Sequence, residues 1–175
     1  MSEMISSPSL DQVWQWLDEV KDPEIPVISL TELGIIRSVR YQENELVVTV
    51  TPTYSGCPAT SIINLDIETA LRGHGVERLR LERQLSPAWT TDWISPSGRD
   101  KLLAYGIAPP IDGTAADGRV QARLETMVTG RNLAIACPRC KSLETEKISQ
   151  FGSTPCKASY RCSECLEPFD YFKCI

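Results

Sequence analysis

The sequence predicts an α+β protein in which a small mixed β-sheet with helices on one face is followed by a C-terminal four-cysteine, zinc-ribbon-like β module. Two observations support this fold class. Helix-like and strand-like hydrophobic patterns alternate over residues 1–110 in the order α-β-β-α-β-α. Six of the seven cysteines lie after residue 136, and clustering of this kind favours metal binding over a disulfide framework. We therefore expect an α+β domain at 1–110, a linker at 111–132 and a four-cysteine ribbon at 133–175.

Composition and motifs argue against several classes of function. The net charge of −5 and the pI of about 5.0 argue against a general nucleic-acid binder, because such proteins gain affinity from Lys and Arg on phosphates. No stretch approaches the ~18 apolar residues of a membrane span, and the first residues lack the basic and apolar regions of a signal peptide. We therefore expect a cytoplasmic protein with neither a membrane nor a nucleic-acid partner. Dinucleotide and ATP motifs are absent.

The first predicted element is an amphipathic helix. Ser9 and Gln12 fit a capping box, and apolar residues recur at helical spacing from Leu10 to Val20. Asp22-Pro23 ends the helix, because the residue before a proline avoids the α region.

Three strands and two further helices follow. We predict strands at 35–41 and 46–52 joined by a hairpin turn, a helix at 60–71, a third strand at 76–85 and a short helix at 97–105. Because the helix at 60–71 joins the second and third strands, that pair should be parallel.

The loop Thr51–Ala59 connects the second strand to its helix. Pro58 suits the first helical position, which would place Cys57 at the N-cap. There the positive end of the helix dipole would favour the thiolate, the better nucleophile and metal ligand. An equally good interpretation from position alone is a small buried apolar residue at a packed turn.

Asp22 and Glu24 are the acidic candidates near this loop. They could act as ligands or proton handlers beside Cys57 if their connector folds back, although a solvated turn that ends the helix is the simpler interpretation. His74 is the only histidine, so a zinc site built on several histidines or a di-iron His/carboxylate site is not supported.

Two C-x-x-C motifs define the metal module. Cys137 with Cys140, and Cys162 with Cys165, each place two thiolates on one turn, and 21 residues separate the pairs. Facing each other, they would form a closed tetrahedral site. Zinc is the default ion, and a rubredoxin-like iron site would use the same four thiolates. Cys156 and Cys174 are either small buried residues beside the site or extra thiols that could serve as alternative ligands.

Two groups of motifs in this sequence resemble those of known families. Asp22-Pro23-Glu24 and the loop Thr51–Pro58 are similar to the small domain of iron–sulfur cluster assembly factors, the family that includes SufT. Trp89–Ser95, Gly106–Pro110 and the tail from Phe151 to Lys173 resemble an accessory subunit of the bacterial phenylacetyl-CoA epoxidase system.

The resemblance implies an accessory protein of phenylacetate catabolism and not the oxygenase itself. Cys57 matches the family's reactive cysteine, and Asp22 and Glu24 match its acidic motif. Cys57 would then hold iron or an iron–sulfur cluster transiently or bind the client, and Asp22 and Glu24 would shape that site. The implied partners are the di-iron oxygenase subunits and the reductase that carries flavin and an iron–sulfur cluster.

Three hypotheses follow. The protein is a maturation factor for one of these components, a stoichiometric interaction subunit without metal transfer, or a rubredoxin-like electron carrier. Whether Cys57 acts within a homodimer stays open.

Overall fold

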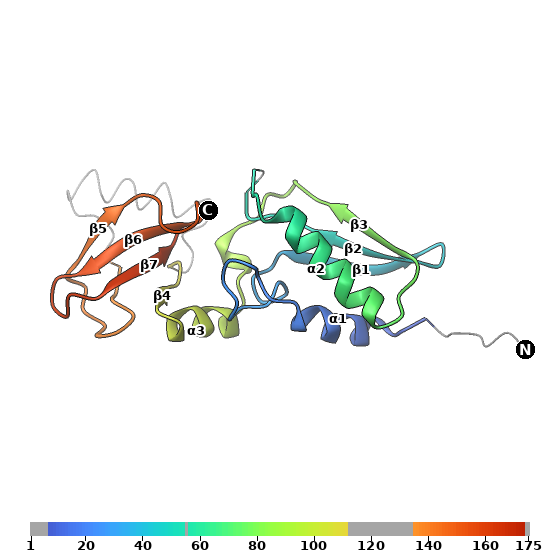
Figure 1. The fold of residues 1–175 in the computed structure, drawn as a ribbon, viewed down its shortest axis with the longest axis horizontal. Helices are drawn as coiled ribbons and strands as arrows, with labels where there is room; N and C mark the ends of the chain where they lie inside the picture. The colour runs from blue at the N-terminus through green and yellow to red at the C-terminus, as the bar shows by residue number, and fades with distance from the viewer. Residues whose placement is uncertain (1–6, 55, 112–134, 174–175) are drawn as a thin grey trace, which may run out of the picture. The chain divides into compact units, whose positions relative to one another are not determined.

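A computed structural model describes residues 7–54, 56–111 and 135–173 of the chain, which divides into two compact units, Met1–Trp89 and Thr90–Ile175 (Figure 1). The predicted linker lies outside the described residues except for Ile111. Residues 90–110, which we predict as part of the α+β domain, belong to the second unit. The two units are described separately below.

The first helix, α1 (Leu10–Glu19), begins at the predicted capping box. The Ser9 hydroxyl accepts the Gln12 N–H at 3.2 Å, and the Gln12 side chain accepts the Ser9 N–H at 3.0 Å. Both groups would otherwise be among the unpaired donors at the start of a helix. Val13 and Leu17, one turn apart, are fully buried, so the amphipathic pattern anchors α1 to the core.

Strands β1 (Ile36–Gln42), β2 (Glu45–Val50) and β3 (Leu79–Arg83) form a mixed sheet in the order β1-β2-β3. β1 and β2 are antiparallel and are joined by a tight turn at Glu43 and Asn44, both with positive φ, as short hairpin turns require. Helix α2 (Thr60–Gly73) then crosses over, and β3 pairs with β2 in parallel. The α+β prediction is confirmed, although the strand ends differ from the predicted ones by a few residues.

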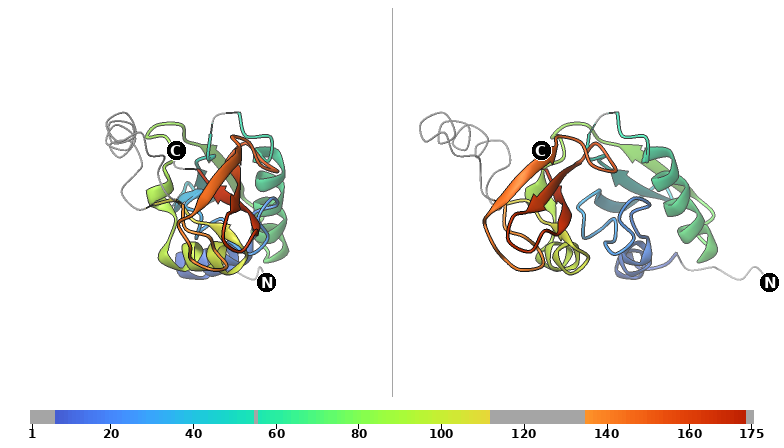
Figure 2. Two further views of the ribbon diagram at one scale, coloured as in Figure 1. Left: turned by 90° about the vertical axis from the view of Figure 1, so that its left-hand side faces the viewer. Right: turned by 60° about the vertical axis from the view of Figure 1, so that its left-hand side comes forward.

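Among the described residues, helices cover one face of this sheet. Figures 1 and 2 show α2 running along that face, with α1 beside it. Successive residues of β2 point to opposite faces, so Leu46, Val48 and Val50 share the helix-covered face. All three are buried, as are Ile63 and Ile67 of α2. The apolar core of the first unit therefore lies between β2 and the helices.

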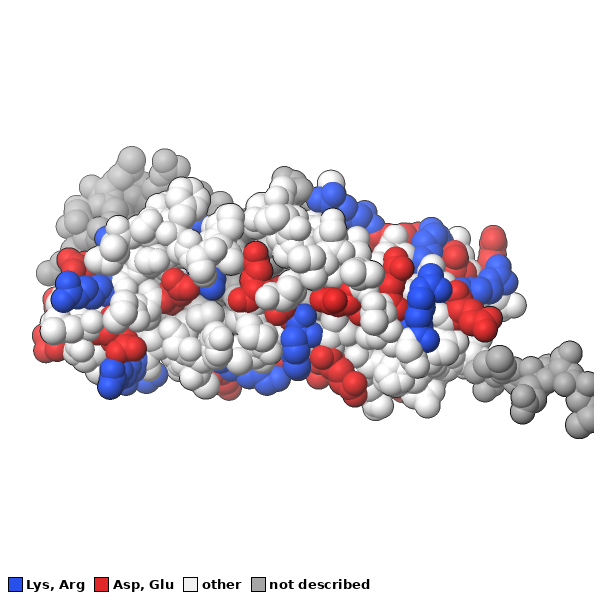
Figure 3. Space-filling view, in the orientation of Figure 1, with Lys and Arg blue, Asp and Glu red and all other residues white. Residues whose placement is uncertain are grey.

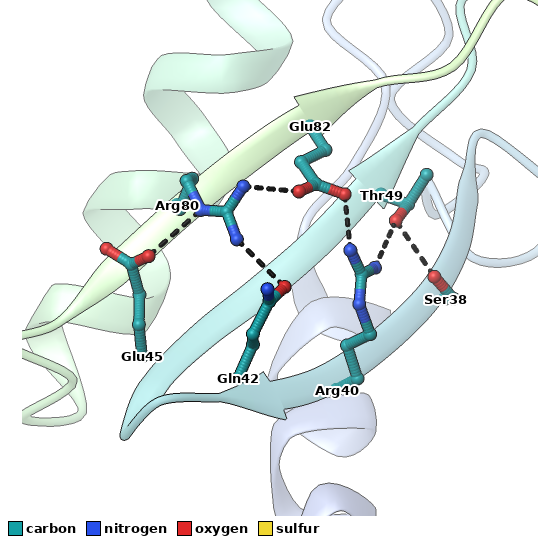
Figure 4. A network of polar contacts seen from close by, with 7 residues as sticks. All are labelled: Ser38, Arg40, Gln42, Glu45, Thr49, Arg80 and Glu82. Carbon is teal, nitrogen blue, oxygen red and sulfur yellow. Dashed lines mark hydrogen bonds and ion pairs between the residues drawn. The ribbon is translucent and has the colours of Figure 1, made fainter.

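The other face of the sheet carries a hydrogen-bonded network (Figure 4). Arg80 on β3 donates to Glu45 at 2.9 Å, and Glu82 accepts from both Arg80 and Arg40. The hydrogen bond from Arg40 lowers the pKa of the Glu82 carboxyl. Both arginines are cross-strand neighbours of Val47, which is fully buried. We infer that their aliphatic stems shield the central strand from water.

Helix hydropathy and the distribution of surface charge bear on the partners that the protein can have. Within the described ranges, no helix is both long and apolar enough to cross a membrane. On the face shown in Figure 3, Lys and Arg side chains are interspersed with Asp and Glu and do not gather into one patch. This face therefore lacks the single-signed field that would steer a polyanion.

The second unit contains a four-stranded sheet in the order β4-β7-β6-β5. Its strands are β4 (Ile107–Ala108), β5 (Thr145–Ser149), β6 (Lys157–Cys162) and β7 (Pro168–Phe172). β5, β6 and β7 are antiparallel neighbours, and β4 pairs with β7 in parallel.

The segment before the ribbon, residues 90–111, contributes strand β4 to this second sheet. A short 3-10 helix, η1 (Thr91–Trp93), and helix α3 (Pro96–Ala104), capped by Ser95, lead into β4 (Figure 2). Ala108 of β4 is buried in one cluster with Ile135, Tyr160 and Tyr171. The ribbon strands therefore share a core with β4.

Candidate functional site

The four predicted cysteines converge at one end of the second sheet. The sulfur atoms of Cys137, Cys140, Cys162 and Cys165 all lie within 4.8 Å of one another. Sulfurs from different motifs lie close together, with 3.7 Å between Cys137 and Cys165 and 3.5 Å between Cys140 and Cys162. The predicted metal-binding ribbon is confirmed, and a set of four thiolates fits zinc or iron in tetrahedral coordination.

The two C-x-x-C turns have the same local geometry. The N–H of Cys137 donates to the Ser142 carbonyl at 2.9 Å, and the N–H of Cys162 donates to the Glu167 carbonyl at 2.9 Å. The residue after each second cysteine, Lys141 or Leu166, has a positive φ. Each turn thus closes on itself and directs its two sulfurs to the same point.

The sulfurs perturb one another's protonation. The backbone N–H of Cys165 is the main group that lowers the pKa of Cys162, to about 7. At Cys165 the N–H of Glu167 acts to lower the pKa, but burial and the neighbouring sulfurs outweigh it and raise the pKa to about 12. The four thiols therefore cannot all ionise on their own, and a bound cation would displace their remaining protons.

The loop that carries Cys57 differs from its predicted geometry. Helix α2 starts at Thr60 with Ala59 at the N-cap, so the placement of Cys57 at the N-cap is wrong. Pro58 and Ala59 form a turn ahead of the helix, and the Cys57 carbonyl accepts the Thr60 N–H at 3.3 Å and the Thr60 hydroxyl at 2.8 Å. A proline fits such a turn as well as it fits a first helical position.

The Cys57 thiol is accessible. Its residue is partly exposed, between the exposed Gly56 and Pro58. The backbone N–H of Cys57 donates to the Tyr54 carbonyl at 3.1 Å, so the main chain is held on both sides of the side chain. Cys57 is therefore neither a helix-capped thiolate nor a sealed core residue.

Asp22 stabilises the turn after α1. One of its carboxylate oxygens accepts the N–H groups of Glu24 at 2.9 Å and Ile25 at 2.8 Å, and the N–H of Asp22 donates to the Ile28 carbonyl at 3.0 Å. Asp22 is only 7% exposed, so the simpler interpretation of a solvated turn does not hold for it. Glu24 is partly buried.

Asp22, Glu24 and Cys57 do not belong to a convergent donor group in the part of the chain that the structure describes. Among the described residues, the four cysteines of the ribbon are the only group of three or more Cys, His, Asp or Glu whose donor atoms converge on one point. A joint role of Asp22, Glu24 and Cys57 stays a prediction, and any ion they hold would need ligands from elsewhere.

Other residues near the two sites were missed or only partly anticipated. Thr51, at the start of the Cys57 loop, is 1% exposed, and its hydroxyl has no hydrogen-bond partner within the described part of the chain. Lys157 on β6 is buried with its ammonium 3.3 Å from Asp170.

The two extra cysteines are not part of the four-sulfur group as far as the structure describes them. Cys156 is buried outside that group, with its sulfur 3.0 Å from the Thr154 hydroxyl, and Cys174 lies outside the described residues. Sequence patterns carry no signal for such buried polar contacts.

Comparison with known proteins gives two family matches and several similar solved structures. The family described as "Iron-sulfur cluster assembly protein" matches residues 10–78, and the family described as "PaaD zinc beta ribbon domain" matches residues 121–173. A solved structure of the domain DUF59 from Bacillus anthracis aligns at a TM-score of 0.49 with 26% identity, covering 53% of this chain and 89% of that one.

Two curated relatives were also found. "Fe-S protein maturation auxiliary factor" of Porphyromonas gingivalis is 32% identical over 55% of this chain and 90% of its own length. A protein of Escherichia coli K12, named as a subunit of the "Putative 1,2-phenylacetyl-CoA epoxidase", is 46% identical over 98% of this chain and 96% of its own length. In this chain the iron–sulfur cluster assembly domain is followed by the zinc β-ribbon domain, and with 46% identity to that relative over nearly its full length the chain belongs to the PaaD family.

Proposed function

We propose that this protein is a non-catalytic accessory factor of a bacterial phenylacetyl-CoA epoxidase system that assists assembly of an iron–sulfur cluster or iron centre in another component. The names of the two curated relatives support the pathway and the type of role. The observation that carries the proposal is Cys57, a partly exposed thiol on a short loop between β2 and α2 of the assembly domain.

Cys57 is suited to holding cargo briefly. Its sulfur makes no hydrogen bond with the described residues, while its backbone is fixed by Tyr54 and Thr60. A single thiolate cannot complete the coordination of iron or of a cluster, so the remaining ligands would come from the client protein or from a second copy of this chain. Incomplete coordination favours release to a client that offers the full set.

Asp22 and Glu24 are proposed to shape this cargo site. The Asp22 carboxylate fixes the backbone of the connector through two N–H groups, and Glu24 is left partly accessible. A preordered carboxylate near the cargo would favour a hard cation such as ferrous iron over a purely thiolate-seeking ion.

The ribbon is proposed to hold a resident ion. Zinc is the expected metal, and its role is to stabilise the second unit so that this unit can dock the client. The clients we expect are the di-iron oxygenase subunits or the reductase that carries flavin and an iron–sulfur cluster. We place the protein in the cytoplasm, where reducing conditions keep its thiols free.

A second candidate is a stoichiometric interaction subunit without metal transfer. The word "subunit" in the name of the Escherichia coli relative favours it. The ribbon also exposes large apolar side chains suited to a protein contact: Leu143, Ile148, Phe151 and Leu166.

Co-expression separates the two candidates. The epoxidase components are produced with the wild-type chain, with Cys57→Ser, or with Cys156→Ser as a buried control thiol, and the iron and sulfide content of each purified component is measured. The maturation role predicts that Cys57→Ser lowers client loading to the level found without this protein and that Cys156→Ser does not. Full loading in an intact, active complex containing Cys57→Ser would establish the interaction subunit instead.

A further inference from the structure

The four ribbon cysteines differ in their access to solvent. The first cysteine of each C-x-x-C turn, Cys137 or Cys162, is 0% exposed. Cys165 is half-buried and packs against the apolar cluster of the second unit. Cys140, its counterpart in the other turn, is exposed. Within the described residues, Cys140 is thus the ligand that a dissolved reagent can reach most directly.

We propose that Cys140 is an oxidation site through which hydroperoxides open the metal centre, ending in a Cys140–Cys162 disulfide and release of the ion. Sulfurs that ligate a metal are deprotonated, and oxidation of cysteine follows thiolate character and exposure. Cys140 combines both properties, whereas Cys137 and Cys162 lack the exposure.

A neighbouring sulfur supplies the second step. Cys162 Sγ lies 3.5 Å from Cys140 Sγ, while Cys137 Sγ lies 3.7 Å from Cys165 Sγ. A disulfide bond of about 2.05 Å would need only a small approach of the two side chains. Cys162 therefore lies within reach of an oxidised Cys140, and we assign it as the resolving thiolate.

The chemistry balances with a hydroperoxide as the two-electron oxidant. The Cys140 thiolate attacks the peroxide, the O–O bond breaks, Cys140 becomes a sulfenic acid, and the leaving oxygen takes a proton to give water or an alcohol. The Cys162 thiolate then attacks Cys140 Sγ, the S–O bond breaks, and the expelled hydroxide takes a proton to give water. Each sulfur has lost one electron and one bond to the ion.

Two thiolates, Cys137 and Cys165, then remain, and two ligands do not satisfy a site that needs four. The ion should leave, and the second unit should lose the stability that it supplies. The site would thereby sense peroxide, a product expected wherever oxygen is activated. This inference depends on the ribbon alone and stands whether or not Cys57 carries cargo.

The test uses the full-length chain with Cys57→Ser and Cys156→Ser, loaded with zinc, so that neither thiol competes. Hydrogen peroxide is added in steps from zero to two equivalents. Zinc release is followed with a chromogenic chelator, and the disulfide is mapped by differential alkylation and mass spectrometry. We expect one zinc released per peroxide consumed, a Cys140–Cys162 disulfide as the first product, and recovery on adding dithiothreitol and zinc.

A reagent that does not oxidise provides an independent measurement. Iodoacetamide at low concentration should label Cys140 of the zinc-loaded protein before the other three ligands, at least about tenfold faster than Cys137, because alkylation also follows thiolate exposure. A first disulfide between any other pair, retention of zinc after two equivalents of peroxide, or equal alkylation of the four cysteines would overturn the proposal.

Discussion

The two cysteine sites of this protein differ in what surrounds the sulfur. The four ribbon cysteines converge within 4.8 Å, each turn closed by its own backbone hydrogen bonds. Cys57 stands alone on a short loop in a unit whose stability comes from an apolar core between β2 and the helices. Under the proposed function, one site retains an ion and the other passes one on, because retention needs a complete ligand set and transfer needs an incomplete one.

Removal of the resident metal should have the largest effect and tests whether the two units are stabilised in different ways. Chelation should unfold the second unit, since a small ribbon without its ion lacks a sufficient core, and should leave the first unit folded. Hydrogen exchange read by mass spectrometry should show lost protection in α3 and in β4 through β7, with α1 and α2 unchanged. Loss of protection in both units, or in neither, would contradict the separate bases of stability.

A core substitution in the first unit tests whether zinc binding in the second unit depends on the stability of the first. Ile67→Ala on α2 removes a fully buried side chain and should lower the free energy of unfolding of the first unit by about 2–5 kcal/mol. Zinc affinity of the ribbon should not change. The measurements are chemical denaturation followed by tryptophan fluorescence and a competitive zinc titration, and a weakened zinc affinity would show that the units are coupled.

The pH dependence of zinc binding should sharpen the description of the ribbon. Zinc needs thiolates, so protons compete with it and affinity rises with pH. The pKa of Cys162 is lowered to about 7 and that of Cys165 is raised to about 12. Above pH 7, Cys162 is already ionised and only the remaining protonated thiols must lose a proton. Below pH 7, Cys162 must also lose a proton. The slope of log affinity against pH should therefore be larger below pH 7 than above it, by about one unit.

A competitive titration from pH 6 to 8 checks this slope. A constant slope across that range would mean that Cys162 is not the sulfur that ionises first.

The smallest expected effect concerns α1. Ser9→Ala removes the hydroxyl that accepts the Gln12 N–H and should cost about 1 kcal/mol in the first unit. Ser9→Asp is the matched control, because Asp also caps helices well. Thermal unfolding should place Ser9→Ala below the wild type and Ser9→Asp close to it. Equal stability of all three would mean that this cap contributes nothing.

Local patterns predicted much of this molecule. The capping box at Ser9, the parallel pairing of β2 with β3 and the convergence of two C-x-x-C turns all follow from residue spacing and chain connectivity, and the structure has all three. They are set by interactions within a few residues or by a rule about crossover connections.

Features that depend on distant partners were not predictable. β4 has only two residues, Ile107 and Ala108, and it is a strand because β7 lies beside it. The burial of Asp22 likewise reflects how its connector folds back to Ile28. The assignment of Cys57 to the N-cap is wrong because Pro58 suits both a turn and a first helical turn, and the structure has the turn, with Ala59 at the N-cap.

The central claim is that Cys57 handles passing iron while the ribbon keeps its own ion. Metal and sulfide content of wild type and Cys57→Ser, both purified without oxygen, tests it most directly. We predict about one tightly held ion per chain in both proteins, from the four-thiolate site, and an additional labile fraction of iron in the wild type alone. Labile iron retained by Cys57→Ser, or loss of the tightly held ion from it, would contradict the account.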